Sequence, residues 1–80
     1  MDYTVEARIS FKKGVLDAEG ETIQKSLGLL DYPVKKVETI RVYAIKVEAN
    51  SEVEALDSVR SACEKLLANP VIQDFDLKVV

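Results

Sequence analysis

The sequence predicts a single α+β domain over residues 1–80, with the element order β-α-β-α-β and an antiparallel sheet. Apolar and polar residues alternate at the start, in the middle and at the end of the chain, as they do in strands. Two stretches between them repeat their apolar residues at helical spacing and carry helix start and stop signals. We expect a ferredoxin-like half-sandwich, with both helices on one face of the sheet and the other face used for oligomerisation.

The first strand is predicted over Tyr3–Phe11, where every second residue is apolar or aromatic. This period of two is typical of a strand with one buried and one solvated face. Lys12-Lys13-Gly14 interrupts the alternation and indicates a turn.

The first helix is expected to begin at Asp17, an N-cap residue, and to end before Tyr32-Pro33, because the residue before proline avoids the α region. Gly28 lies inside this span, and the sequence leaves open whether it is the C-cap or a point of close packing within the helix. The apolar stripe of this helix consists of Ile23, Leu27 and Leu30.

The middle strand, Val37–Glu48, is long and apolar on both faces. Tyr43, Ile45 and Val47 lie on one face, which the two helices can cover. Nothing else in the chain can cover the other face, so a second copy is predicted to do so, and a bend at the centre would let this strand serve as two. The predicted oligomer interface consists of Ile40, Val42 and Ala44.

The second helix begins with a capping box formed by Ser51 and Glu54 and ends at Asn69-Pro70. A last alternating strand follows, with Phe75, Leu77 and Val79 on its apolar face. The apolar stripe of the helix consists of Leu56, Val59, Cys63 and Leu66.

Composition narrows the class of protein. A chain of 80 residues has marginal stability alone, and one cysteine with no histidine provides neither an internal disulfide nor a zinc site, which leaves oligomerisation. The net charge of −3 argues against nucleic-acid binding. No apolar run approaches a membrane span and no secretory signal is visible, so a cytoplasmic location is expected.

No catalytic residue, cofactor site or metal site is predicted on this chain. Without histidine, a catalytic triad cannot form, and the three glycines match no phosphate-binding loop. Cys63 lies on an apolar stripe and is expected to be a buried, unreactive thiol. Acids near the start of the first helix are explained by capping.

Two segments carry a resemblance to a known family. Lys13–Gly20, followed by Ile23 and Leu27, and the unbroken run Cys63–Phe75 resemble the small PurS subunit of multi-subunit phosphoribosylformylglycinamidine synthase, across essentially the whole chain. Ala18 departs from the proline that is usual in that family. The stretch Val37–Val42 lacks the glycine and tyrosine of its usual pattern.

The resemblance implies a non-catalytic subunit of de novo purine biosynthesis. The synthase converts formylglycinamide ribonucleotide, glutamine and ATP into phosphoribosylformylglycinamidine and glutamate. A glutaminase subunit releases ammonia, a large synthetase subunit uses ATP and Mg²⁺, and the small subunit, a dimer or a dimer of dimers, bridges the two and assists ammonia transfer. Candidate docking charges are the loop residues Lys12, Lys13, Lys35 and Lys36.

Two other functions were compared with this one, and the first of them remains open on the sequence. Ligand-sensing ACT-like regulatory dimers use a similar small fold, and the glycine-containing turn Lys13–Leu16 is a weak match to theirs. A stand-alone acylphosphatase-type enzyme is disfavoured, because no phosphate-cradling loop is present.

Overall fold

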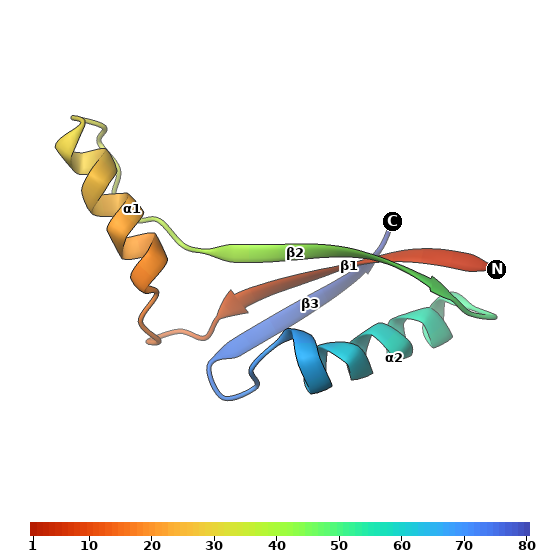
Figure 1. Cartoon of the computed structure of the whole chain (residues 1–80). Coiled ribbons are helices and arrows are strands. Elements are labelled where there is room, and N and C mark those ends of the chain that lie inside the picture. The colour runs from red at the N-terminus through yellow and green to blue at the C-terminus, as the bar shows by residue number, and fades with distance from the viewer.

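A computed structural model describes residues 1–80 and shows a three-stranded antiparallel sheet in the order β2-β1-β3 (Figure 1). The central strand is β1 (Asp2–Phe11), and its neighbours are β2 (Ile40–Glu48) and β3 (Gln73–Val79). Helix α1 (Ala18–Leu29) joins β1 to β2. The predicted α+β class and the β-α-β-α-β order are confirmed.

Helix α2 (Glu52–Ala62) covers one face of the sheet and continues into a single π-helical turn, Cys63–Leu67. Its predicted cap is confirmed, since Ser51 Oγ accepts a hydrogen bond from the Glu54 amide at 3.2 Å. Beyond the π turn, Asn69 Oδ1 accepts from the Val71 amide at 3.0 Å and so shapes the turn into β3.

The hydrophobic core lies between α2 and the sheet. Val5 and Ala7 of β1 and Ala55 and Cys63 of α2 and its π turn have no exposed surface, and Val59 is 2% exposed. The alternation of β1 predicts this face, because consecutive strand residues point to opposite sides.

The molecule is elongated. It measures 51 × 24 × 15 Å and has a radius of gyration of 15.9 Å, against about 12 Å for a compact domain of this length. Its accessible surface is 6053 Å², whereas a compact monomer of 8.9 kDa exposes about 4,800 Å². The single chain therefore exposes roughly 1,200 Å² more than a self-sufficient domain of its size.

The two helices do not share a face of the sheet, which differs from the expectation. Helix α2 packs on the sheet, but α1 extends away beyond the end where β1 stops and β2 begins (Figure 1). The physical reason is that α1 is bonded to the residues just before β2, and that α2 already occupies the apolar sheet face.

The middle strand is not bent into two. Strand β2 is continuous over Ile40–Glu48 and pairs only with β1, while Val37 and Thr39 lie before the strand and contact α1 instead. The Val37 and Thr39 amides thus donate to the side chains of Gln24 and Asp17 and not to a strand.

Helix α1 does not end at Gly28. Asp31 has a left-handed backbone with φ of 67°, its amide donates to Gly28 O, and the Tyr32 amide donates to Leu27 O, both at 3.1 Å. These two bonds form a Schellman motif. Gly28 is therefore an ordinary residue of the last turn, with nothing within 4 Å of the position that a Cβ would take.

Candidate functional site

The candidate functional surfaces are exposed apolar strips, and the first lies on the outer face of β2. In the strand register, Ile40 is opposite Ser10, Val42 is opposite Arg8 and Ala44 is opposite Glu6. The neighbouring strand β1 is thus polar on this face, and the apolar strip is one strand wide. Ile40 is 36% and Val42 is 56% exposed, and their role as an oligomer interface stays a prediction.

The second strip lies on α1, where the sequence predicted burial. Leu30 is 67% and Ile23 is 42% exposed, and Leu16, just before the helix, is 67% exposed. An isolated helix of fewer than about 12–15 residues is marginal in water. Helix α1 has 12 residues and buries only Gly20, so its apolar strip is left without a cover in the single chain.

Asp17 joins α1 to the start of β2. Its Oδ1 accepts from the Gly20 amide and from Thr39 Oγ1, both at 2.9 Å, and its Oδ2 accepts from the Thr39 amide at 2.6 Å. The hydrogen bonds from the Gly20 and Thr39 amides hold the pKa of the Asp17 carboxyl below its ordinary value of 3.8. The sequence predicted the N-cap but not the bond to Thr39, because nothing local relates residues 22 positions apart.

Gly20 lets the two segments approach. A Cβ at this position would lie 2.5 Å from the Val37 carbonyl oxygen, closer than real Cβ contacts allow. Gln24, one turn further along α1, accepts a hydrogen bond from the Val37 amide at 3.3 Å. The joint between α1 and the chain before β2 is therefore built from one carboxylate, one amide and one missing side chain.

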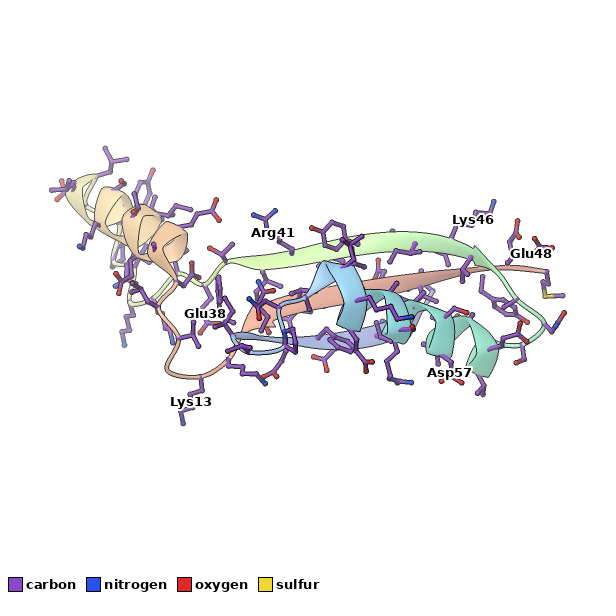
Figure 2. The ribbon with its side chains drawn as sticks, turned by 60° about the horizontal axis from the view of Figure 1, so that its bottom comes forward. Lys13, Glu38, Arg41, Lys46, Glu48 and Asp57 are labelled. Carbon is purple, nitrogen blue, oxygen red and sulfur yellow. The ribbon has the colours of Figure 1, made fainter.

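The predicted docking lysines lie outside the helices and strands, as expected. Lys12 pairs with Asp74 at 2.6 Å, and Lys36 pairs with Glu38 at 3.0 Å. Lys13, which projects from the turn after β1 in Figure 2, makes no ion pair, and neither does Lys35.

The turn after β1 and the chain before β2 border one open hollow of about 500 Å³. Lys12, Lys13 and Lys36 meet at its rim, so the structure brings three of the four predicted docking residues together. Lys35 does not line it. The carboxylates of Asp17, Glu21 and Glu38 also border the hollow, so its charge is mixed.

Cys63 is fully buried, which confirms the predicted structural role. Burial, and to a lesser degree the charge of Glu64, raises the pKa of its thiol above 9.0, so the thiol is protonated at neutral pH. No three His, Cys, Asp or Glu side chains come together as ligands for a metal ion. Neither helix has the length and apolar composition needed to cross a membrane.

The fold and its exposed apolar strips define a small α+β domain of the interaction-module class, with a larger surface than a compact monomer of its mass. The family model described as "PurS: Phosphoribosylformylglycinamidine (FGAM) synthase" matches residues 4–80. The PurS subunit of phosphoribosylformylglycinamidine synthase from Archaeoglobus fulgidus is 50% identical over 70 residues, which cover 86% of this chain and 88% of that protein. The chain belongs to the PurS family.

Solved structures agree in fold over the whole chain. The crystal structure of PurS from Methanocaldococcus jannaschii, a subunit of formylglycinamide ribonucleotide amidotransferase, has a TM-score of 0.87 at 42% identity and covers 98% of this chain and 95% of that one. A chain in the structure of PurLQS from Thermotoga maritima has a TM-score of 0.91 at 30% identity, with 100% and 99% covered. The protruding α1 is thus part of a fold that these relatives share.

Proposed function

We propose that this chain is the non-catalytic small subunit of a phosphoribosylformylglycinamidine synthase, and that it bridges the glutaminase and synthetase subunits. The observation that carries the proposal is the end-to-end likeness to a chain of the PurLQS assembly. The family match over residues 4–80 supports the same reaction, the glutamine- and ATP-dependent conversion of formylglycinamide ribonucleotide in purine biosynthesis.

A bridging subunit has a physical role in this reaction. Ammonia released at one active site is protonated in bulk water and ceases to be a nucleophile, so its delivery needs docked sites that exclude water. A rigid bridge holds the two active sites in register and so assists ammonia transfer. ATP and Mg²⁺ belong, in this proposal, to the large subunit.

The bridge is a homodimer, or a dimer of dimers. Each chain exposes roughly 1,200 Å² more surface than a compact monomer of its mass. This excess is larger than the area that one partner buries in a standard interface, which is about 800 Å². Self-association together with docking of larger subunits accounts for an excess of this size.

Docking to the catalytic subunits uses the basic residues near α1. Lys13 and Lys35 have no partner within the chain, which supports this role. Reversal of both to Glu should slow assembly with the catalytic subunits and make it less sensitive to salt, because rim charges act mainly on association rate. Lys25→Glu, an exposed charge on α1, is the matched control. Equal binding by both variants would remove these lysines from the interface.

Reconstitution tests the function itself. The glutaminase and synthetase subunits are mixed with and without this chain, and glutamine-dependent formation of phosphoribosylformylglycinamidine is compared with the ammonia-dependent reaction. We expect the glutamine-dependent rate to need this chain and the ammonia-dependent rate to be much less affected. A glutamine-dependent rate that is the same without the chain would overturn the proposal.

One observation favours a second candidate, a small-molecule sensor of the ACT type. The hollow of about 500 Å³ lies at the turn that contains Gly14, whose φ is 85°. Such a site would raise the unfolding midpoint when an amino acid binds, by mass action. A panel of amino acids that leaves the midpoint unchanged would exclude this function.

A further inference from the structure

Strand β3 lies at one side of the sheet and pairs only with β1, so its other side is a free edge (Figure 1). The Lys12 amide donates to Ile72 O at one end of this ladder. The Val80 amide donates to Thr4 O at the other end. Because bonded and non-bonded pairs alternate in an antiparallel ladder, the even-numbered residues of β3 bond to β1. The odd-numbered residues direct their N–H and C=O groups outward.

The outward groups of β3 are unoccupied over most of the strand. The Gln73 amide donates to Asn69 O at 2.8 Å, so its place is taken. The free part of the edge begins at Phe75 and continues through Leu77 and Val79. Helix α2 packs across the face of the sheet over β1, and none of its groups is hydrogen-bonded to this edge.

An open hollow of about 820 Å³ lies at the start of β3. Asp74 and Asp76, which border it, point to the sheet face that α2 leaves uncovered. Phe75, which also borders it, points to the face on which α2 packs. Residues of both faces can border one hollow only at the rim of the sheet. The hollow therefore lies beside the free edge, where a further strand would have to fit.

This hollow has an excess of negative charge. Glu64 of the π turn borders it together with Asp74 and Asp76, and Lys12 is its one cation. Lys12 pairs with Asp74 at 2.6 Å. Asp76 lies opposite Arg8 in the register, but neither Asp76 nor Glu64 forms an ion pair. Such an edge attracts a basic segment and repels an acidic one.

We infer that an extended segment of a catalytic subunit adds to the sheet as a fourth strand along β3. The segment carries basic residues opposite Asp74 and Asp76, and apolar residues in the alternate positions. In this mode of recognition the main-chain hydrogen bonds provide affinity and the alternate side chains provide specificity. The inference rests on the bridging role in the proposed function and adds a second docking surface to the basic residues near α1.

A second copy of this chain is the competing occupant. Self-pairing of β3 about a two-fold axis at Phe75 sets Asp74 against Asp76, and an axis at Asp76 sets this residue against itself. Like charges directly opposite are destabilising. Only an axis at Leu77, with Asp76 facing Lys78, avoids them. The predicted oligomer interface lies on β2, at the opposite side of the sheet, which leaves β3 for a different partner.

Removal of one edge N–H tests the inference without changing a side chain. Native chemical ligation at Cys63, the single cysteine, joins residues 1–62 to a synthetic segment 63–80 with an N-methyl group on the Leu77 amide. The methyl group obstructs an added strand but spares the bonds of the even-numbered residues to β1. The matched control is the unmodified chain made by the same ligation. Both are titrated into the glutaminase and synthetase subunits, and glutamine-dependent synthesis is measured. The methylated chain should reach half-maximal synthesis only at about tenfold higher concentration.

The outcomes separate this inference from the proposed function. Equal half-maximal concentrations for the two chains overturn the strand addition and leave the bridging function intact. Synthesis that does not need the unmodified chain overturns the bridging function itself. Sedimentation tests the competing occupant. If the methyl group abolishes self-association and leaves binding to both catalytic subunits unchanged, a second copy occupies the edge and the inference is wrong.

Charge removal provides a second test that needs no ligation and decides the question if the methylated chain does not fold. Asp76→Asn combined with Glu64→Gln should weaken binding to the catalytic subunits about fivefold and reduce its dependence on salt. Glu48→Gln combined with Glu52→Gln removes two exposed carboxylates from β2 and the start of α2 and is the matched control. Equal binding by both double variants contradicts a basic partner at this edge.

Discussion

Helices α1 and α2 are nearly equal in length, with 12 and 11 residues, and each begins with a side-chain cap, yet their surroundings are opposite. Helix α2 packs on the sheet and buries Ala55 and Val59, whereas α1 buries only Gly20. Leu29 and Leu30 of the α1 end are 86% and 67% exposed. An apolar stripe on a helix therefore does not by itself show that the helix packs on the sheet of its own chain.

The difference lies in what holds each helix. Helix α2 is held by apolar burial, the larger contribution to stability in folded proteins. Helix α1 is held at its first turns by hydrogen bonds to Asp17 and Gln24 and by the close approach at Gly20. We therefore expect α1 to open in local fluctuations that leave the α2 core intact.

The largest expected effect is a charge placed in the α2 core. Val59→Asp puts a carboxylate at a position that is 2% exposed and should cost more than about 4 kcal/mol of unfolding free energy. Leu30→Asp, at a position that is 67% exposed, should change it by less than about 0.5 kcal/mol. Urea unfolding followed by circular dichroism measures both. Similar losses for the two variants would mean that α1 is as firmly packed as α2.

A smaller effect is expected from a methyl group at the joint. Gly20→Ala places a Cβ 2.5 Å from the Val37 carbonyl oxygen, so the helix must move away, at a cost of about 1–3 kcal/mol. Gly28→Ala has open space and should stabilise the helix by up to about 1 kcal/mol. Hydrogen exchange of the α1 amides compares the two. Faster exchange in Gly20→Ala alone is the expected result, and equal behaviour would argue against a close joint.

Acid should loosen the same joint. The folded-state pKa of Asp17 lies below its ordinary value of 3.8. The stability that the ionised carboxylate gives to the joint is therefore complete above pH 3.8 and is lost as the pH falls through the lower, folded-state pKa. In Asp17→Asn the side-chain oxygen can still accept from the Gly20 amide, but the NH₂ group would face the Thr39 amide, which is also a donor. The Asn side chain does not titrate. We expect α1 in this variant to be less protected at neutral pH and less sensitive to acid below pH 4. An unchanged acid response would exclude Asp17 as its source.

The sequence predicted the parts of the fold that local patterns determine. The alternation in β1, the Ser51 cap and the burial of Cys63 follow from periodicity and capping, and the structure confirms them. The position of α1 did not follow, because it depends on Asp17 bonding to Thr39, a contact 22 residues away. Such a contact leaves no periodic signal in one sequence.

The surfaces were predictable only in part. The two-sided apolar pattern of the middle strand identified Ile40 and Val42 as uncovered, and both are exposed in the single chain. The free edge of β2 could not be foreseen, because strand order is a property of the whole sheet.

The smallest expected effect concerns the far end of α1. Asp31 adopts a left-handed backbone with φ of 67°, a conformation that glycine adopts without a Cβ penalty. Asp31→Gly should therefore stabilise the Schellman turn by less than about 1 kcal/mol, and Asp31→Ala should weaken it by a similar amount. Because α1 opens separately from the core, the change should be visible in the exchange of α1 amides and absent from α2 amides. A shift of both helices together would show that α1 and α2 unfold as one unit, and the contrast between them would then be one of packing alone.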